Sequence, residues 1–325
     1  MSQRLVNAWY ARSPWPWLLL PLAFLYALVT RLRRFFYRTG VLRSTKFPVP
    51  VVVIGNITAG GTGKTPLTLA LIDILQADGW RPGIVSRGYG GKANYPLSVQ
   101  ADTPAAVAGD EPLALQRRSG VPVVVDPLRA RAVDFLLQQT DCNIVLCDDG
   151  LQHYALGRDI EVVVIDGARG LGNRLPLPAG PLREPPSRLA TADFVVINGG
   201  DVEWPDAHRM RLEPGAWYGL ADKTRTPPLS GARIHAIAGI GNPSRFFSQL
   251  ALAGYDVVPH PFPDHHVFTA ADLAFDDGLP VVMTEKDAVK CEGFAQVNWW
   301  VVPVTAQLPP AFHDGLLQRL QAFRR

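Results

Sequence analysis

The side chains best suited to chemistry come directly after an apolar run that ends at residue 55. The stretch NITAGGTGKTPL (56–67) ends like a phosphate-binding loop, with Gly63, Lys64 and Thr65 in the order G-K-T. In such loops backbone N–H groups surround the phosphates, the lysine reaches the outer phosphates, and the neighbouring hydroxyl ligates Mg²⁺. Where the usual pattern begins with glycine, this chain has Thr58. The stretch therefore predicts a nucleotide site with an unusual first position.

Two further glycines keep the backbone of this loop adaptable despite Thr58. Gly60 and Gly61 supply conformational freedom inside the loop, and the helix expected to start near Lys64 aims its positive end at the same place. The alternative is a tight strand–helix turn with an incidental lysine. The residues expected to bind the nucleotide are Thr58, Ala59, Gly60, Gly61, Thr62, Gly63, Lys64 and Thr65.

A second apolar run ends in two carboxylates. IVLCDDGLQH (144–153) has the form of a buried strand followed by Asp148 and Asp149, and open α/β sheets bind their ligands at this carboxyl edge. A carboxylate placed there holds Mg²⁺ directly or through water. For either aspartate alone, the alternative is a strand end that caps a helix. Gln152 and His153 follow in a loop at the same edge.

Two other polar clusters leave alternatives open. Asp110 and Glu111 in GDEP stand at an expected helix start, where they act either as helix caps or as a Mg²⁺ ligand and a base. Arg183 and Glu184 lie in the Gly/Pro-rich stretch LPAGPLREP, and Arg87 lies in SRGYG. Because the guanidinium group is suited to forked contacts with phosphate, the arginines could bind an anionic acceptor.

The segment FPDHHVF (262–268) contains Asp264, His265 and His266. Adjacent histidines seldom bind one metal ion together, and the sequence has no cysteine pair or second histidine pair that would support zinc. An Asp–His or His–substrate interaction suits the segment better, and exposed loop histidines are the alternative.

The elements around these motifs predict an α/β fold. From residue 49 onward, Val/Ile-rich runs alternate with helical patterns, which is typical of a parallel sheet covered on both faces. We expect a P-loop NTPase-like parallel sheet domain over residues 41–215, a second, smaller α/β domain over residues 216–325, and an N-terminal membrane-associated helix over residues 1–40. The expected strands are 49–55, 81–90, 121–126, 142–150, 160–167, 193–199 and 299–304, and the expected helices include 64–79 and 127–139; residues 280–290 suggest a strand and a charged turn.

Composition places the chain among folded proteins of a reducing compartment. The 325 residues are 47% hydrophobic and 19% charged, and the net charge of +3 is too small to indicate a nucleic-acid partner. Three cysteines without a metal-binding spacing suggest reduced, buried thiols. No feature of the sequence indicates a protein partner.

The N-terminal segment is the exception to this ordinary composition. WPWLLLPLAFLYALV (15–29) carries no charge and forms a helix of about 22 Å, short for a bilayer core of roughly 30 Å. The basic and aromatic stretch TRLRRFFYR that follows suits lipid headgroups. We expect residues 13–38 to contact the membrane, either spanning it or embedded in one leaflet, and a buried core helix is the alternative. The arginines place the rest of the chain in the cytoplasm.

Eight motifs in this order resemble the lipid A 4′-kinase (tetraacyldisaccharide 4′-kinase) family of Gram-negative bacteria. They are GNITAGGTGKTP, SRGYGG, GDEP, CDDGLQH, LPAGPLREP, AIAGIGNPSRFF, FPDHH and TEKDAVK, and together with the N-terminal segment they span nearly the whole chain. The family's own loop has this variant form, so Thr58 fits the pattern. The resemblance implies an enzyme at the cytoplasmic face of the inner membrane that uses ATP and Mg²⁺ to phosphorylate the 4′-hydroxyl of a tetraacyldisaccharide 1-phosphate.

The resemblance also implies roles for the candidate side chains. Lys64, Asp149 and an Asp110–His265 pair are implied to be catalytic, with the choice between His265 and His266 left open. Thr65, Glu111 and Asp148 are implied to hold Mg²⁺. The residues implied to contact the lipid acceptor are Arg87, Gln152, His153, Arg183, Glu184 and His266.

Two other classes of protein share parts of this pattern. A membrane-associated P-loop ATPase or GTPase that acts as a switch or targeting factor would also carry the loop and the two aspartates, but the NKxD motif that recognises guanine is absent from the sequence. A non-catalytic scaffold with a degenerate nucleotide fold would not need Lys64, Thr65, Asp148 and Asp149.

Overall fold

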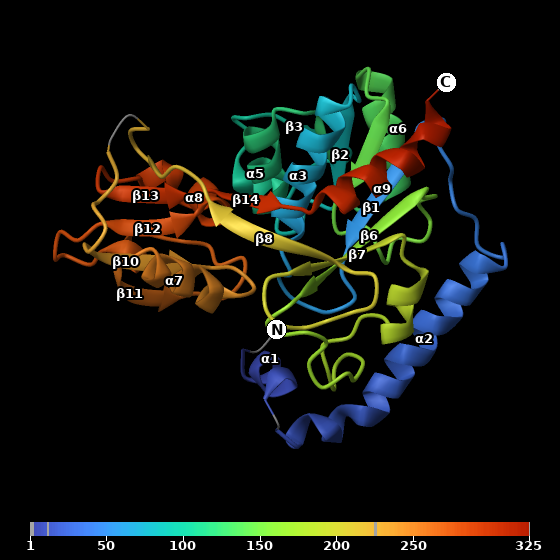
Figure 1. Ribbon diagram of the computed structural model, residues 1–325, viewed down its shortest axis with the longest axis horizontal. Helices are drawn as coiled ribbons and strands as arrows, with labels where there is room; N and C mark the ends of the chain where they lie inside the picture. Colours follow the sequence, from blue (N-terminus) through green and yellow to red (C-terminus); the bar gives the residue numbers. More distant parts are fainter. Residues whose placement is uncertain (1–2, 12, 224–225, 325) are drawn as a thin grey trace.

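Two β-sheets of unequal size organise the chain, and a long N-terminal helix lies along one side (Figure 1). The computed structural model describes residues 3–11, 13–223 and 226–324. The larger sheet has nine strands and the smaller has five. The three cysteines are buried and unbridged.

The larger sheet is parallel except at its two edges, where β3 and β14 run antiparallel to their neighbours. The loop 56–63 and the pair Asp148–Asp149 come together because β1 lies beside β5, and both strands end at the same edge. In spatial order the strands are β14 (Val304–Gln307), β8 (His208–Pro214), β7 (Phe194–Asn198), β6 (Ile160–Asp166), β1 (Val51–Gly55), β5 (Ile144–Cys147), β2 (Pro82–Ser86), β4 (Val123–Val125) and β3 (Leu97–Val99).

Helices cover both faces of this sheet, which is why its central strands are apolar throughout. Side chains alternate along β1, so that Val52 and Ile54 face one apolar cluster while Val51 and Val53 face the other. The first cluster is closed by α3 (Lys64–Ala77), α5 (Asp110–Ser119) and α9 (Pro310–Leu320), and the second by α6 (Arg129–Gln139) and the 3₁₀ helix η2 (Pro186–Thr191). A short helix, α4 (Ala105–Ala108), precedes α5.

The smaller sheet is built in the same way from later residues. Its strands are β11 (Asp256–Pro261), β10 (Arg233–Ala238), β12 (Val281–Thr284), β13 (Trp299–Val302) and β9 (Tyr218–Gly219), and only β9 is antiparallel to its neighbour. Helix α7 (Pro243–Leu252) contributes to the core on one face, and α8 (Glu285–Cys291) to the core on the other. Three 3₁₀ turns complete this part and the C-terminus: η3 (Ala270–Leu273), η4 (Glu292–Phe294) and η5 (Gln321–Phe323).

The chain crosses between the two sheets twice. The sequence analysis expected one crossing, with residues 41–215 in the first domain and residues 216–325 in the second. It enters the smaller sheet after β8, close to the expected boundary at residue 215, but β14 and α9 return to the larger sheet. Residues 304–323 therefore lie with the larger sheet rather than with the second domain. The run WWVVPV, expected as one strand, is interrupted at Pro303, so that β13 and β14 belong to different sheets.

Most other expected elements agree with the structure to within a few residues. The expected helix 64–79 ends at Ala77, and the charged turn expected within 280–290 is the helix α8. The strands β3, β8, β9 and β14 and the helix α9 were not expected. Three of these strands have four residues or fewer, and β8 is largely polar, so none of the four has the continuous apolar run that marks the central strands.

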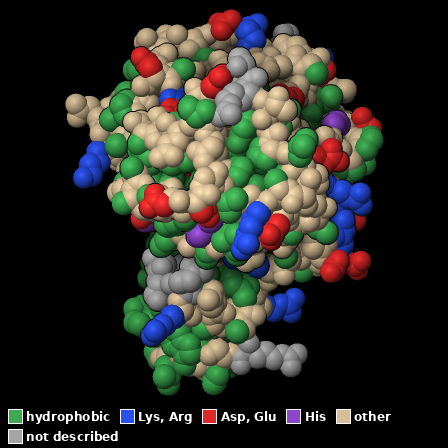
Figure 2. Space-filling model, turned by 90° about the vertical axis from the view of Figure 1, so that its left-hand side faces the viewer, with side chains coloured by type: hydrophobic (Ala, Val, Ile, Leu, Met, Phe, Trp, Pro, Cys, Tyr) green, Lys and Arg blue, Asp and Glu red, His purple; other side chains and the backbone are tan. Residues whose placement is uncertain are grey.

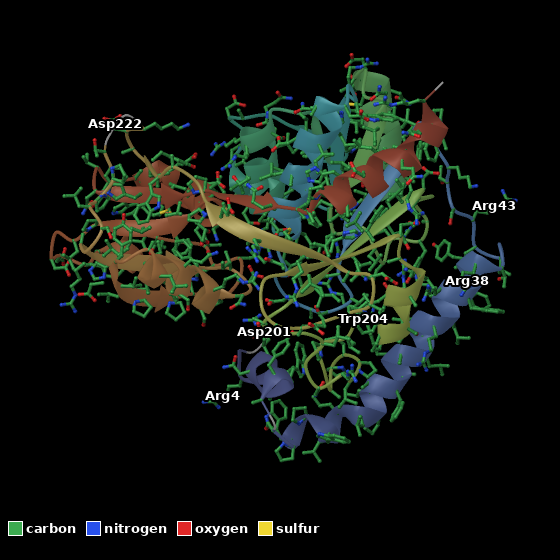
Figure 3. All side chains as sticks on the ribbon, viewed as in Figure 1. Arg4, Arg38, Arg43, Asp201, Trp204 and Asp222 are labelled. Carbon is green, nitrogen blue, oxygen red and sulfur yellow. The ribbon has the colours of Figure 1, made fainter. Side chains whose placement is uncertain are left out.

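The N-terminal segment forms α1 (Gln3–Tyr10), the 3₁₀ helix η1 (Trp15–Leu19) and α2 (Leu20–Arg38). Within the described residues, Trp15–Arg38 is the one helical stretch long and apolar enough to cross a membrane. Ala23 is buried against the body of the protein, whereas Leu18 is 82% exposed and Leu25 is 59% exposed. Hydrophobic side chains accordingly gather at the lower end of the molecule in Figure 2, where Figure 1 places these helices. Arg4 lies at the lower edge of the molecule in Figure 3, and Arg38 ends α2 at its right-hand side.

Candidate active site

The predicted phosphate-binding loop connects β1 to α3, and a neighbouring loop supports it. The Thr58 side chain is buried, and its backbone forms a bridge with Leu182. The N–H group of Ala59 donates to the carbonyl of Pro181 at 2.7 Å. Thr58 therefore replaces the expected glycine because this position pairs with another segment and needs no positive φ. Gly60 and Gly63, with φ of 107° and 97°, make the turn instead.

The far side of the loop is held by a strand of the larger sheet and by the second domain. Asn198, at the end of β7, donates from Nδ2 to the carbonyl of Thr62 at 2.9 Å. A Cβ atom added to Gly63 would lie 2.2 Å from that same Nδ2, and one added to Gly241 would lie 2.2 Å from the backbone N of Gly61. The loop is thus enclosed by direct backbone contact with residues 239–243 of the smaller domain.

Lys64 lies between the loop and the second predicted aspartate. Its Nζ is 3.3 Å from Oδ1 of Asp149 and 3.4 Å from Oδ1 of Asn56. Arg183 approaches the same aspartate at 3.3 Å. Burial alone would raise the pKa of Asp149, but Lys64 and Arg183 outweigh it and hold the pKa below the usual range. Asp149 is therefore an ionised partner of both cations.

Asp148 has the opposite environment. Both of its carboxylate oxygens are buried without a hydrogen-bond partner, and burial together with the nearby Glu111 raises its pKa to about 7. A buried, unpaired carboxylate fits a divalent cation, which would supply the missing charge. No cluster of three or more His, Cys, Asp or Glu side chains able to hold a metal occurs in the described ranges.

The structure brings Asp110 and His265 together from the two domains. Nδ1 of His265 lies 3.1 Å from both carboxylate oxygens of Asp110. Between the two candidate histidines, this geometry favours His265, because Nε2 of His266 lies 3.3 Å from Asp272 instead. The ring of His266 also packs against Phe262 and Phe268, and its expected contact with the acceptor stays a prediction.

The Asp110–His265 pair favours separated charges. Burial acts against the ionised form of each partner, but the hydrogen bond between them outweighs it. The pKa of Asp110 is lowered, with Lys286 and Lys290 contributing, and the pKa of His265 is raised. A carboxylate stabilised in this way is ionised across the neutral range and can accept a hydrogen bond from a hydroxyl group.

Glu111, the other acid of GDEP, faces a lysine that the sequence analysis did not single out. Nζ of Lys286, on α8, lies 2.9 Å from Oε1 of Glu111 and 3.0 Å from Oδ1 of Asp264. Burial lowers the pKa of Lys286, but the surrounding carboxylates outweigh it and raise the pKa above its usual value. Lys286 belongs to the motif TEKDAVK. Nothing in the sequence around a lysine at a helix start predicts its contact with Glu111, which lies 175 residues away.

The expected acceptor residues divide into a buried network and a more open group. Glu184 is 5% exposed and accepts from Gln152 at 2.8 Å, from Tyr154 at 2.5 Å and from Arg188 at 3.2 Å. Its carboxylate is therefore committed to shaping the loop that contains Arg183. Glu184 and Gln152 are more suited to positioning this loop than to direct contact with an acceptor.

The more open group contains cations around a neutral imidazole. Arg87 is exposed, and burial together with Arg129 and Arg87 lowers the pKa of His153 to about 4. Arg129 was not identified from the sequence. It is 3% exposed, and its Nε and Nη2 have no hydrogen-bond partner. Its only sequence signal is a charge at the start of an amphipathic helix, which usually marks an exposed residue.

A cavity of about 180 Å³ lies between the domains, bordered by the phosphate-binding loop on one side and by α7 and α8 on the other. Lys64, Glu111 and Lys286 line it together with apolar side chains such as Leu212 and Phe246. The cavity therefore joins a charged end, suited to phosphates, to an apolar part suited to a planar base.

Comparison with known proteins shows a family match over nearly the whole chain. Residues 15–321 match the family described as LpxK, tetraacyldisaccharide-1-P 4′-kinase. The chain is 51% identical to a tetraacyldisaccharide 4′-kinase of Pseudomonas putida, with 98% of each chain covered, and 49% identical to one of Nitrosococcus oceani, covering 98% of this chain and 95% of that protein.

A solved structure extends the similarity to the fold. The crystal structure of LpxK from Aquifex aeolicus, described as an "apo" form in complex with ATP, matches with a TM-score of 0.77 at 26% identity, over 94% of this chain and 99% of that one. Both comparisons cover nearly the full length. The chain belongs to the LpxK family, the tetraacyldisaccharide-1-phosphate 4′-kinases, and is a kinase of lipid A biosynthesis.

Proposed function

We propose that the chain transfers the γ-phosphoryl group of ATP to the 4′-hydroxyl of a tetraacyldisaccharide 1-phosphate, with Asp110 as the base and with Mg²⁺ as cofactor. The observation that carries this assignment is the 3.1 Å contact between Asp110 and His265, made beside the phosphate-binding loop by residues of different domains. A nucleotide switch would not need such a pair, whereas a kinase must activate a hydroxyl group.

In the proposed reaction, Asp110 accepts the proton of the 4′-hydroxyl while that oxygen bonds to the γ-phosphorus and the bond to the leaving ADP breaks. His265 orients the carboxylate and stabilises its charge. General-base assistance of this kind typically contributes about 10²–10⁴-fold to the rate. Lys64 contacts the outer phosphates, and N–H groups of the loop 59–63 hold the others.

The metal site is proposed at Asp148, with Thr65 and Glu111 as further ligands. Mg²⁺ bound there would neutralise charge on the phosphates. The two unpartnered oxygens of Asp148 supply the negative charge that such an ion requires. Asp149 is engaged by Lys64 and Arg183, so its role is to position these two cations.

The acceptor is proposed to approach from the membrane along α2. Tyr26 donates from its hydroxyl to the carbonyl of Arg183 at 3.3 Å, and Arg34 donates to Thr191 at 3.1 Å. These contacts tie α2 to the loop that carries Arg183 and to η2. A lipid whose chains stay in the bilayer could then present its headgroup to Arg183, Arg87 and His153. We place the enzyme on the cytoplasmic face, with residues 13–38 as the membrane contact.

The test is phosphoryl transfer from labelled ATP to a tetraacyldisaccharide 1-phosphate in detergent. The wild-type chain is expected to label the lipid, and Asp110→Ala is expected to lower kcat by about 10²–10⁴-fold while ATP still binds. Asp134→Ala, which removes an exposed carboxylate of α6, is the control. Hydrolysis of ATP without any label on the lipid would instead support the switch hypothesis, and full activity of Asp110→Ala would remove the base assignment.

A further inference from the structure

Lys286 is a cation of the second domain that faces the nucleotide cavity, and the proposed reaction leaves it without a role. It is the second residue of α8, and it lines the same cavity as Lys64 and Thr65. Its side chain is 16% exposed. A lysine this deeply placed must have a charged partner, because burying an unpaired ammonium group is costly.

The partners of Lys286 are three carboxylates at the reacting end of the site. Its Nζ lies 2.9 Å from Glu111, 3.0 Å from Asp264 and 3.9 Å from Asp110. Because Asp110 is the proposed base, it must lie next to the hydroxyl group that attacks the γ-phosphorus. A cation 3.9 Å from this carboxylate is therefore at the γ-phosphate end of the nucleotide, not at the base or the α-phosphate.

We propose that Lys286 is a further catalytic residue, an ammonium group that the second domain brings to the γ-phosphoryl group during transfer. With three carboxylates in reach, Lys286 can exchange one of them for a phosphate oxygen and remain charge-paired. It stays protonated throughout: the proton of the 4′-hydroxyl goes to Asp110, the new P–O bond forms, and ADP leaves. This inference rests on the proposed function.

The backbone around Lys286 is held in a way that suits this role. The side chain of Thr284 caps α8 by accepting from the N–H of Asp287. Asp287 is fully buried and accepts from the N–H of Gly239 at 3.0 Å. Residues 239–243 in turn touch the phosphate-binding loop at Gly61. The position of Lys286 is thus linked to the loop that holds the phosphates, and domain separation would remove both contacts together.

Lys286 differs from its neighbour Lys290, which is also 3.9 Å from Asp110. Lys290 forms a 2.7 Å ion pair with Asp287 and lies over the ring of Phe268, and it is not among the residues that line the cavity. Lys290 therefore supports the helix, whereas Lys286 faces the place where phosphates are expected.

The test compares ATP with ADP, because only ATP carries the γ-phosphate. In Lys286→Met we expect ATP to bind about tenfold more weakly and ADP to bind within about twofold of the wild type, since one charge-assisted hydrogen bond is lost from ATP alone. Binding is measured by titration calorimetry without acceptor. In the transfer assay kcat is expected to fall about 10²–10³-fold, while KM for the lipid changes by less than about threefold. Lys223→Met removes an exposed lysine of the second domain and is the control.

Two results would overturn the proposal. Equal losses of ATP and ADP affinity would mean that Lys286 only supports the fold. The second result would be a transfer rate of Lys286→Met that returns to the wild-type rate as pH rises from about 6 to about 9. That recovery would mean that Lys286 only keeps Asp110 ionised. If Lys286→Met does not fold, as judged by circular dichroism, Lys286→Gln is judged by the same criteria. A wrong assignment of Asp110 as the base would give a different pattern of results. Asp110→Ala would then be fully active, while Lys286→Met would still bind ATP more weakly and ADP almost as well as the wild type.

Discussion

The contact between Gly61 and Gly241 predicts that one methyl group will separate the two domains. In Gly241→Ala the new Cβ would lie 2.2 Å from the backbone N of Gly61 and 2.6 Å from its Cα, whereas ordinary contacts begin at 3.4 Å. The two backbones must therefore move apart by about 1.2 Å. Neither atom of Gly61 belongs to a flexible side chain, so the strain cannot be relieved by a rotamer change.

The direction of the movement follows from the other contacts of residues 239–243. The carbonyl of Gly241 accepts from Arg169 at 2.6 Å, and Asn242 donates to Asp166 at 3.1 Å. Arg245 reaches the same aspartate at 2.5 Å. These bonds oppose the separation, so the phosphate-binding loop will be deformed as well. A displacement of about 1 Å near a reacting centre is expected to lower kcat about 10²-fold.

Steady-state transfer kinetics and thermal unfolding check this prediction. Gly241→Ala is expected to lower kcat strongly and to destabilise the fold by about 1–3 kcal/mol. Gly293→Ala is the matched control, because a Cβ at this position of the second domain meets no atom within 4 Å. If the folded Gly241→Ala protein turned over within about threefold of the control, the contact would not constrain the site, and the reasoning would be refuted.

Two further predictions concern the metal site and the membrane. Replacing Asp148 with asparagine is expected to raise the free energy of unfolding without metal by about 2–4 kcal/mol near pH 8 and by little near pH 4. Burial and Glu111 raise the pKa of Asp148 to about 7, so the folded protein loses stability as pH rises from the unfolded-state pKa of about 4 to about 7, and the loss levels off above that value. Urea unfolding at the two pH values measures this, and equal effects at both would contradict it. Replacing Leu22 and Leu25, which are 56% and 59% exposed, with glutamate is expected to shift the protein from the membrane to the soluble fraction without lowering Tm. The control is Leu252→Glu, at a residue 88% exposed on the second domain, and an unchanged distribution of the double variant would contradict the membrane contact.

The central strands and the nucleotide loop were predictable because their signals are local. Continuous Val/Ile runs mark β1, β5 and β6, and the G-K-T sequence marks the start of α3. The Asp110–His265 pair required the family resemblance, because 155 residues separate its members. The sequence could not decide between His265 and His266, since both are histidines in one turn. Only the fold turns one toward Asp110 and the other toward Asp272.

The residues that sequence reasoning missed share a physical reason. Lys286, Arg129 and Arg245 are cations on helices, and in most proteins such residues are exposed. Lys286 and Arg245 become informative only through distant partners, Glu111 and Asp166, and Arg129 only through its burial. The return of β14 to the larger sheet was missed for the same reason, because a short strand after Pro303 carries no information about which sheet it will join.

The two crossings between the sheets explain how a site divided between domains can still assemble reproducibly. The chain leaves the larger sheet after β8 and returns through β14, and these two strands are paired. At the crossing itself the N–H of Gly215 donates to the carbonyl of Pro303 at 2.8 Å. Two hydrogen-bonded connections allow less freedom than one, so the second domain can move chiefly by bending about this pair.

Bending about the paired crossing would open or close all of the contacts between the domains at once. These contacts include the Asp110–His265 pair, the Glu111–Lys286 ion pair, the Asp166–Arg245 ion pair and the packing of Gly61 on Gly241. The proposed base is therefore paired with its histidine only when the proposed cation also reaches the nucleotide. We propose that coupling the two in this way restricts phosphoryl transfer to a closed arrangement, in which water would be excluded and the acceptor would be the available nucleophile.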